Sequence, residues 1–167
     1  MNSLPTRSLG VDYGRRNLGL AVSTHGLAPR PLPPLSARGL AFIKQDATDV
    51  IAVARKEGCE GIVVGLPVIS SGNLARPSSD SQQGRRCRRF AEQIADGAFP
   101  WDIRVFLIDE RNTTLFALND MKASGMKKKK ALQMKDSVAA ALMLSAFYDA
   151  PGASVHVPPS TRLTSAL

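Results

Sequence analysis

The sequence contains few of the side chains that form covalent cross-links or bind soft metals. Among 167 residues it has two cysteines and two histidines. Cys59 and Cys87 are too few for a disulfide framework. His25 and His156 lie far apart along the chain, so no Cys/His zinc spacing is present either. Any metal bound by this chain would therefore be held by oxygen ligands.

Long apolar runs and internal repeats are also missing. No stretch approaches the length that spans a bilayer, and the composition, 44% hydrophobic and 22% charged, is typical of a globular protein. We expect a single domain over residues 1–150 and a flexible C-terminal tail over residues 151–167, which are rich in Pro, Ser and Thr. The first predicted strand begins near Met1, so no transit or secretory segment is expected before it. We expect a cytoplasmic protein without membrane contact, or an organellar one from which a transit peptide has been removed.

Acidic side chains are fewer than basic ones. The chain has 22 Lys and Arg against 14 Asp and Glu, a formal net charge of +8. The basic residues cluster at positions 85–89 and in the run Lys127–Lys130. Such a surface attracts polyanions, although charge alone can serve only solubility. Clustering favours a nucleic-acid partner.

Residues 9–22 are the stretch around which the rest is organised. The pattern predicts a strand, a short turn that contains Gly14, and a second strand running back. Because side chains alternate across a strand, Gly10 and Asp12 share one face, and Asp12 lies at the strand's end. An aspartate at this place serves either turn geometry or chemistry.

The remaining chain alternates between strand and helix patterns, as in an α/β protein. Further strands are expected at residues 61–67 and 103–108, and a weak edge strand or loop at the proline-rich residues 27–35. Helices are expected at residues 39–57, 81–96, from Thr113 and Thr114 onward, and 135–148. The arginines of residues 81–96 form a solvated face or meet phosphates. Residues 122–130 are expected to form a mobile basic arm.

Three acids fall at the ends of predicted elements. Asp12 and Glu110 end strands, and Asp136 lies in the first turn of the last predicted helix. Each has an ordinary structural explanation: a turn, a surface ion pair with Arg111, or a helix cap. Together they suggest a cluster of carboxylates, which is costly unless a hard cation such as Mg²⁺ or Mn²⁺ neutralises it. Two such ions can promote phosphodiester cleavage.

Four blocks of sequence resemble the YqgF/RuvX family, which is described both as Holliday junction resolvases and as pre-16S rRNA nucleases. They are Asp12-x-Gly14-x-x-x-x-Gly19-Leu20-Ala21, Val64-Gly65-Leu66-Pro67, Asp109-Glu110-Arg111-x-Thr113-Thr114-x-x-Ala117 and Lys135-Asp136-Ser137-x-Ala139-Ala140. The blocks occur in the family's order over residues 9–148. Together they are far more specific than any one of them.

This resemblance implies an RNase H-like α/β fold, a five-stranded mixed sheet flanked by helices. It implies a metal-dependent nuclease, a hydrolase of ribosome biogenesis and rRNA processing, with Asp12, Glu110 and Asp136 as catalytic and metal-binding residues and Asp109 as a rival to Glu110. The cofactor would be Mg²⁺ or Mn²⁺. The residues expected to contact nucleic acid are basic or flank the acids: Arg15, Arg16, Arg111, Thr114, Lys127, Lys128, Lys129, Lys130 and Lys135. Residues 70–89 and the tail depart from the family pattern, which leaves the substrate open.

Several functions remain compatible with these patterns. The first is an endonuclease acting on structured RNA, such as a ribosomal precursor, or on four-way DNA junctions. A second is a non-catalytic RNA-binding module, in which the acids are structural. A third, an actin-like ATPase or sugar kinase, shares the Asp-x-Gly turn, but those proteins need a second copy of the fold. The chain could act as a monomer or as a homodimer.

Overall fold

The computed structural model describes residues 3–111, 125 and 127–160. Its strands and helices are β1 (Arg7–Tyr13), β2 (Asn17–Thr24), β3 (Leu27–Ser36), α1 (Ile43–Lys56), β4 (Gly61–Leu66), α2 (Gln82–Ala98), β5 (Arg104–Asp109), α4 (Lys128–Asp149) and β6 (Val155–Val157). No helix within these residues is long and apolar enough to cross a membrane.

One mixed sheet forms the centre of the molecule, in the order β3-β2-β1-β4-β5-β6. Strands β1, β4 and β5 are parallel, whereas β2, β3 and β6 each pair antiparallel with their neighbours. Proline-rich β3 is an edge strand, where missing backbone donors do not break the sheet. The expected α/β sheet is thus confirmed, with one strand more than the five that the family resemblance implied.

The sixth strand, β6, lies in the segment that was expected to be a flexible tail. Val155–Val157 pairs with β5, and the backbone nitrogen of Ser160 donates to an Asp96 carboxylate oxygen at 2.7 Å. Residues 155–160 are therefore docked on the domain. The signal was weak because three residues of strand are too short to show a period.

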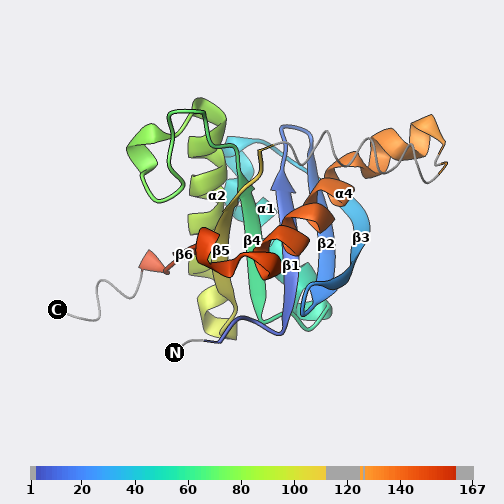
Figure 1. The fold of residues 1–167 in the computed structure, drawn as a ribbon, viewed down its shortest axis with the longest axis horizontal. Coiled ribbons are helices and arrows are strands. Elements are labelled where there is room, and N and C mark those ends of the chain that lie inside the picture. The colour runs from blue at the N-terminus through green and yellow to red at the C-terminus, as the bar shows by residue number, and fades with distance from the viewer. Residues whose placement is uncertain (1–2, 112–124, 126, 161–167) are drawn as a thin grey trace.

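Two hydrophobic clusters cover the two faces of the sheet. On one face the sheet packs against α1 and α2, with Phe90 and Ile94 among the buried residues. On the other face α4 packs Ala140, Met143 and Phe147 against Val63 and its neighbours. Figure 1 shows α4 crossing the sheet on this second face. Strand β4 is buried along its whole length because helices cover it on both faces.

Helix α4 begins earlier than the sequence suggested. It starts at Lys128, so Lys128–Lys130 form its first turn and are not part of an arm. Asp136 consequently lies in the helix interior and does not cap the helix. The helix expected after Thr113 and Thr114 lies outside the described residues.

Glycines in the sheet let α4 come close to the strands. A Cβ added at Gly19 would overlap the backbone carbon and oxygen of Asp136, and one added at Gly10 would lie 2.7 Å from the carbonyl oxygen of Ala140. Side chains at these positions would hold the helix away from the sheet. The glycines therefore determine how near Asp136 lies to the strand that carries Asp12.

Candidate active site

Asp12 lies near the end of β1, on the face covered by α4. It pairs with Gly19 of β2 in the sheet register, and Gly19 in turn contacts the backbone of Asp136. The register and this close contact bring two acids, distant in sequence, to one place. The position predicted from strand alternation is the one observed.

Glu110 directly follows β5 and lies beside Asp12. Its backbone nitrogen donates to the carbonyl oxygen of Leu66 at 3.1 Å, which continues the pairing of β4 with β5. A Cβ at Gly65 would lie 2.5 Å from Glu110 Oε2. Gly65 thus leaves the space that the Glu110 carboxyl group occupies.

The neighbouring Asp109 is bound by Arg111. Its Oδ2 accepts from Arg111 Nε at 2.6 Å, and its Oδ1 accepts from the Arg111 backbone nitrogen at 3.0 Å. Of the two rival acids, Glu110 is therefore the one that approaches Asp12. Arg111, whose side chain is 53% exposed, is paired within this turn.

Asp136 is positioned by the residue that follows it. The Oγ atom of Ser137 accepts a hydrogen bond from the Leu20 backbone nitrogen at 3.1 Å, and both residues are buried. This bond joins α4 to β2 next to Gly19. Sequence reasoning missed the anchoring roles of Ser137 and Gly65, although the apolar strand interrupted by Gly65 was a signal.

The carboxyl groups of Asp12 and Glu110 share a hydrogen bond. Burial, then the charge of Asp136, raises the pKa of Asp12 to about 6, while the Glu110 hydrogen bond and Lys135 act in the opposite direction. Burial, then the charge of Asp12 and this hydrogen bond, raises the pKa of Glu110 to about 8. Glu110 is thus the member of the pair that keeps the proton, and it donates to Asp12.

The donor set fits a hard divalent cation in its chemistry. Within the described residues, no group of three or more Asp, Glu, His or Cys side chains is close enough to hold a metal ion as it stands. However, Asp12 and Glu110 are in contact, and the charge of Asp136 acts on both. Such a site favours a positive charge in place of the shared proton, and oxygen-only donors suit Mg²⁺ or Mn²⁺.

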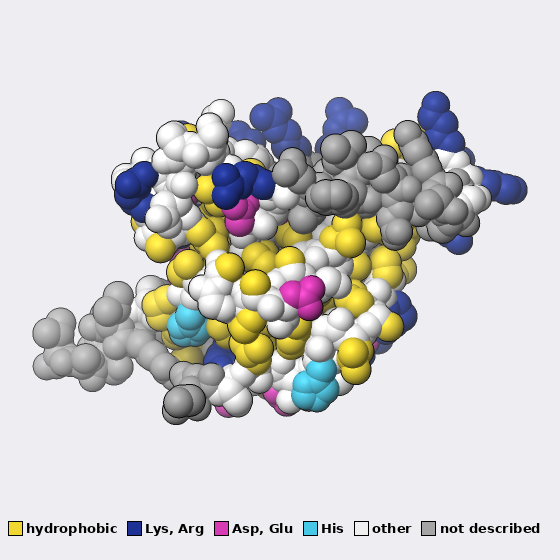
Figure 2. Space-filling view, viewed as in Figure 1, with side chains coloured by type: hydrophobic (Ala, Val, Ile, Leu, Met, Phe, Trp, Pro, Cys, Tyr) yellow, Lys and Arg dark blue, Asp and Glu magenta, His cyan; other side chains and the backbone are white. Residues whose placement is uncertain are grey.

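Basic side chains surround this end of the sheet. Arg15 and Arg16 are exposed in the turn between β1 and β2, and Lys127–Lys130 are exposed at the start of α4. Lys135 lies near enough for its charge to act on Asp12. Figure 2 shows Lys and Arg side chains gathered along the edge of the molecule where β1 ends. Thr114 lies outside the described residues.

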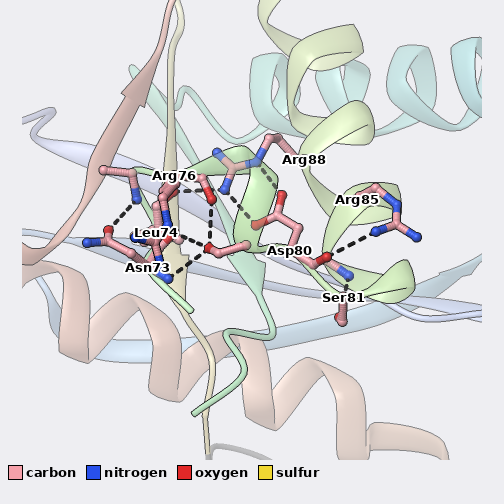
Figure 3. A network of polar contacts seen from close by, with 10 residues as sticks. Asn73, Leu74, Arg76, Asp80, Ser81, Arg85 and Arg88 are labelled. Carbon is pink, nitrogen blue, oxygen red and sulfur yellow. Dashed lines mark hydrogen bonds and ion pairs between the residues drawn. The ribbon is translucent and has the colours of Figure 1, made fainter. Parts of the chain in front are cut away.

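One arginine of α2 has a structural role. Arg88 donates to both carboxylate oxygens of Asp80, at 2.6 and 3.0 Å, and to the carbonyl oxygen of Leu74 at 2.8 Å (Figure 3). Its side chain is 13% exposed and that of Asp80 2%. Arg88 therefore neither faces solvent nor is available to phosphates, and it holds the loop before α2 in place.

Comparison with solved structures defines the class of fold. The chain is similar to *Thermus thermophilus* RuvC bound to a Holliday junction substrate, with a TM-score of 0.55, 19% identity, and coverage of 90% of this chain and 99% of that one. A second structure of *T. thermophilus* RuvC gives the same TM-score at 18% identity. The chain has the RNase H-like fold of RuvC.

Sequence comparison then gives the family. The family model described as "RuvX: Holliday junction resolvase" matches residues 6–150, and the chain belongs to this family. A relative from Clavibacter sepedonicus, named "Putative pre-16S rRNA nuclease", is 37% identical over 139 residues, which cover 81% of this chain and 78% of the relative. A relative of the same name from Anaplasma marginale is 30% identical over 147 residues, with coverage of 86% and 84%.

Proposed function

We propose that this chain is a metal-dependent endonuclease that hydrolyses phosphodiester bonds of structured nucleic acid, with a ribosomal RNA precursor as its substrate. The observation that carries the proposal is the hydrogen-bonded pair of Asp12 and Glu110 beside Asp136, on a basic edge of an RNase H-like sheet. The names of the relatives favour the ribosomal precursor. Such a substrate would place the chain in the cytoplasm.

The three acids would hold Mg²⁺ or Mn²⁺. When bound, such ions activate a water molecule and stabilise the leaving oxygen. Asp12 and Glu110 would provide carboxylate oxygens once Glu110 has lost its proton, with Asp136 as the third ligand. Asp109 does not compete for this role because Arg111 binds it.

The chain's cations would hold the substrate. Phosphate contacts require positive side chains at accessible positions, and they fix the register of the nucleic acid without reading its sequence. Arg15, Arg16 and Lys127–Lys130 are exposed and lie at this end of the domain. Lys135 would offset part of the negative charge next to Asp12.

Cleavage of a four-way DNA junction is the second candidate, because the matched family is described as a resolvase. The same acids would perform the same chemistry on both substrates. A resolvase would need two active sites, and hence a homodimer, whereas RNA trimming is compatible with a monomer. The mass of the chain in solution, measured with and without a junction, distinguishes the two states.

The decisive variant is Asp12→Asn. We expect it to lower the cleavage rate of labelled precursor RNA at least about a hundredfold, since loss of groups that only support metal ligands already costs 10–100-fold. Binding should persist, because the basic residues are unchanged. Cleavage gels with Mg²⁺ or Mn²⁺, run on the RNA and on a DNA junction, measure this effect.

Lys56→Ala is the control, since it removes a charge from the end of α1, beside Glu57, which binds Arg7 at the opposite end of β1 from Asp12. It should cleave at the wild-type rate. Binding by the wild type without metal-dependent cleavage of either substrate would replace the nuclease by a non-catalytic RNA-binding module.

A further inference from the structure

A cavity of about 150 Å³ lies beside the acids, bounded by three segments of the chain. Tyr13, Gly14 and Arg15 come from the turn after β1, Gly39 and Leu40 precede α1, and Gln83 and Arg86 come from the first two turns of α2. Because side chains alternate along β1, Tyr13 faces α2 while Asp12 faces α4. The cavity therefore opens at the same end of the sheet as the acids, on the other face.

Two arginines of this cavity have no partner. Neither Arg15 nor Arg86 makes a hydrogen bond or an ion pair with any residue that the structure describes, although Arg86 is only partly exposed. The nearby carboxylate of Asp46 is already bound by Arg38, through its backbone nitrogen at 3.0 Å and Nη1 at 2.9 Å. The arginines thus present their donors to the cavity.

The cavity wall is continuous with the acid site. Gln83 Nε2 donates to the carbonyl oxygen of Tyr13 at 3.1 Å and contacts Cys87 Sγ at 3.7 Å. The charges of Glu110 and Asp12 both act on the Cys87 thiol. A ligand in the cavity would therefore lie close to a phosphate at the acids.

The chemistry of the lining favours a phosphate over a base. Guanidinium groups are donors only, and their planar fork matches phosphate oxygens. Base recognition uses an open aromatic face, but the Tyr13 ring is 6% exposed and stacked on Phe90, with centroids 4.2 Å apart. The space corresponds to about five water molecules, which a phosphate group would displace.

We propose that this cavity is a second phosphate subsite, in which Arg15 and Arg86 bind a backbone phosphate of the substrate strand next to the one at the acids. This proposal rests on the proposed function. The strand would cross the turn after β1, from the α4 face of the sheet to the α2 face. A substrate would then need a phosphate beyond the cleaved bond on that side.

The test measures binding in an Asp12→Asn background with Mg²⁺, so that no cleavage interferes. Its probes are labelled precursor RNA hairpins, each with one phosphate replaced by a neutral methylphosphonate. Arg86→Ala should weaken binding of the unmodified hairpin roughly tenfold, as expected for charge-assisted hydrogen bonds, and should lower the salt slope by about 0.7–0.9. At one linkage, neutralisation should weaken binding by the parent but not by Arg86→Ala.

Three further variants complete the experiment. Arg15→Ala, an exposed change that leaves packing intact, should lose its sensitivity at the same linkage. Arg86→Lys, which keeps the charge and the aliphatic contact, should retain part of the affinity. Lys56→Ala, which removes one charge elsewhere, should bind within about twofold of the parent, as surface substitutions away from a site usually do.

The outcomes separate this subsite from the proposed function. Additive effects of Arg86→Ala at every linkage, or a salt slope equal to that of Lys56→Ala, would overturn the subsite even if the wild type cleaves RNA. A linkage-specific effect in a chain that never cleaves would support the subsite and overturn the nuclease. Absence of binding to the hairpin would overturn both.

Discussion

At the scale of single residues, the site is a problem of charge. Asp12 and Glu110 are buried, share a hydrogen bond and feel the charge of Asp136. The pair is stable without metal only while it holds a proton. In the unfolded chain both groups ionise near their ordinary pKa values, so folding takes up protons between about pH 4 and pH 8.

This uptake predicts a pH-dependent stability for the metal-free protein. Because the folded pKa values, about 6 and about 8, are raised, the contribution of the pair to the unfolding free energy falls as pH rises from about 4 to about 8. Asp12→Asn should remove much of this fall, since Asn cannot ionise and Glu110 loses a charged neighbour. Thermal melts of both proteins in EDTA across this range measure the difference.

Added Mg²⁺ should act in the opposite direction, since a cation replaces the protons. It should raise the melting temperature of the wild type more at pH 8 than at pH 5, and that of Asp12→Asn little at either pH. A wild-type minus variant difference that does not change with pH would contradict the shared-proton pair.

At the scale of elements, close approach of α4 to the sheet positions Asp136. Gly19→Ala would place a Cβ on the backbone of Asp136, where no flexible side chain can move aside. We expect a loss of about 3 kcal/mol in unfolding free energy, the upper end of typical overpacking effects. Urea denaturation measures it. Gly152→Ala, which meets no atom within 4 Å, should be nearly neutral, and an equal loss in both variants would argue against close packing.

The loop before α2 depends on the pair of Arg88 and Asp80. Arg88→Ala leaves a nearly buried carboxylate without its partner and the Leu74 carbonyl without this donor. We expect a loss of about 3 kcal/mol, as for other broken buried pairs, with protease cleavage at residues 70–80 as a second readout. Arg89→Ala, an exposed neighbour on the same helix, should change stability by less than about 0.5 kcal/mol. Similar losses for both would assign the effect to helix charge.

At the scale of the whole molecule, positive charge gathers at the edge that carries the acids (Figure 2). Lys127–Lys130 open α4, where cations oppose the helix dipole and no acidic residue occupies the first turn. Changing all four lysines to Ala should therefore preserve or increase stability while weakening RNA binding similarly for all sequences. The slope of log affinity against log salt should fall by up to about 3, at about 0.7–0.9 for each lost contact. An unchanged slope would remove this run from the binding surface.

Local pattern was sufficient for much of the fold. The period-2 alternation around Asp12, the buried run of β4 and the helical spacing in α1 and α2 each reflect burial of one element face, which neighbouring residues along the chain record. Four spaced blocks also identified the family, and the match over residues 6–150 confirms it. Strand β6 and the start of α4 were misjudged, because three residues of strand and a run of lysines carry no apolar period.

The sequence by itself determined which residues can carry charge, which stretches must be buried, and the α/β class that follows from them. Only the tertiary structure decided that Glu110, and not Asp109, approaches Asp12, that Arg88 is used inside the loop while Arg86 is not, and that Gly19 admits Asp136. These facts depend on contacts between segments far apart along the chain. Their distances follow from sheet register and helix packing, which no local pattern records.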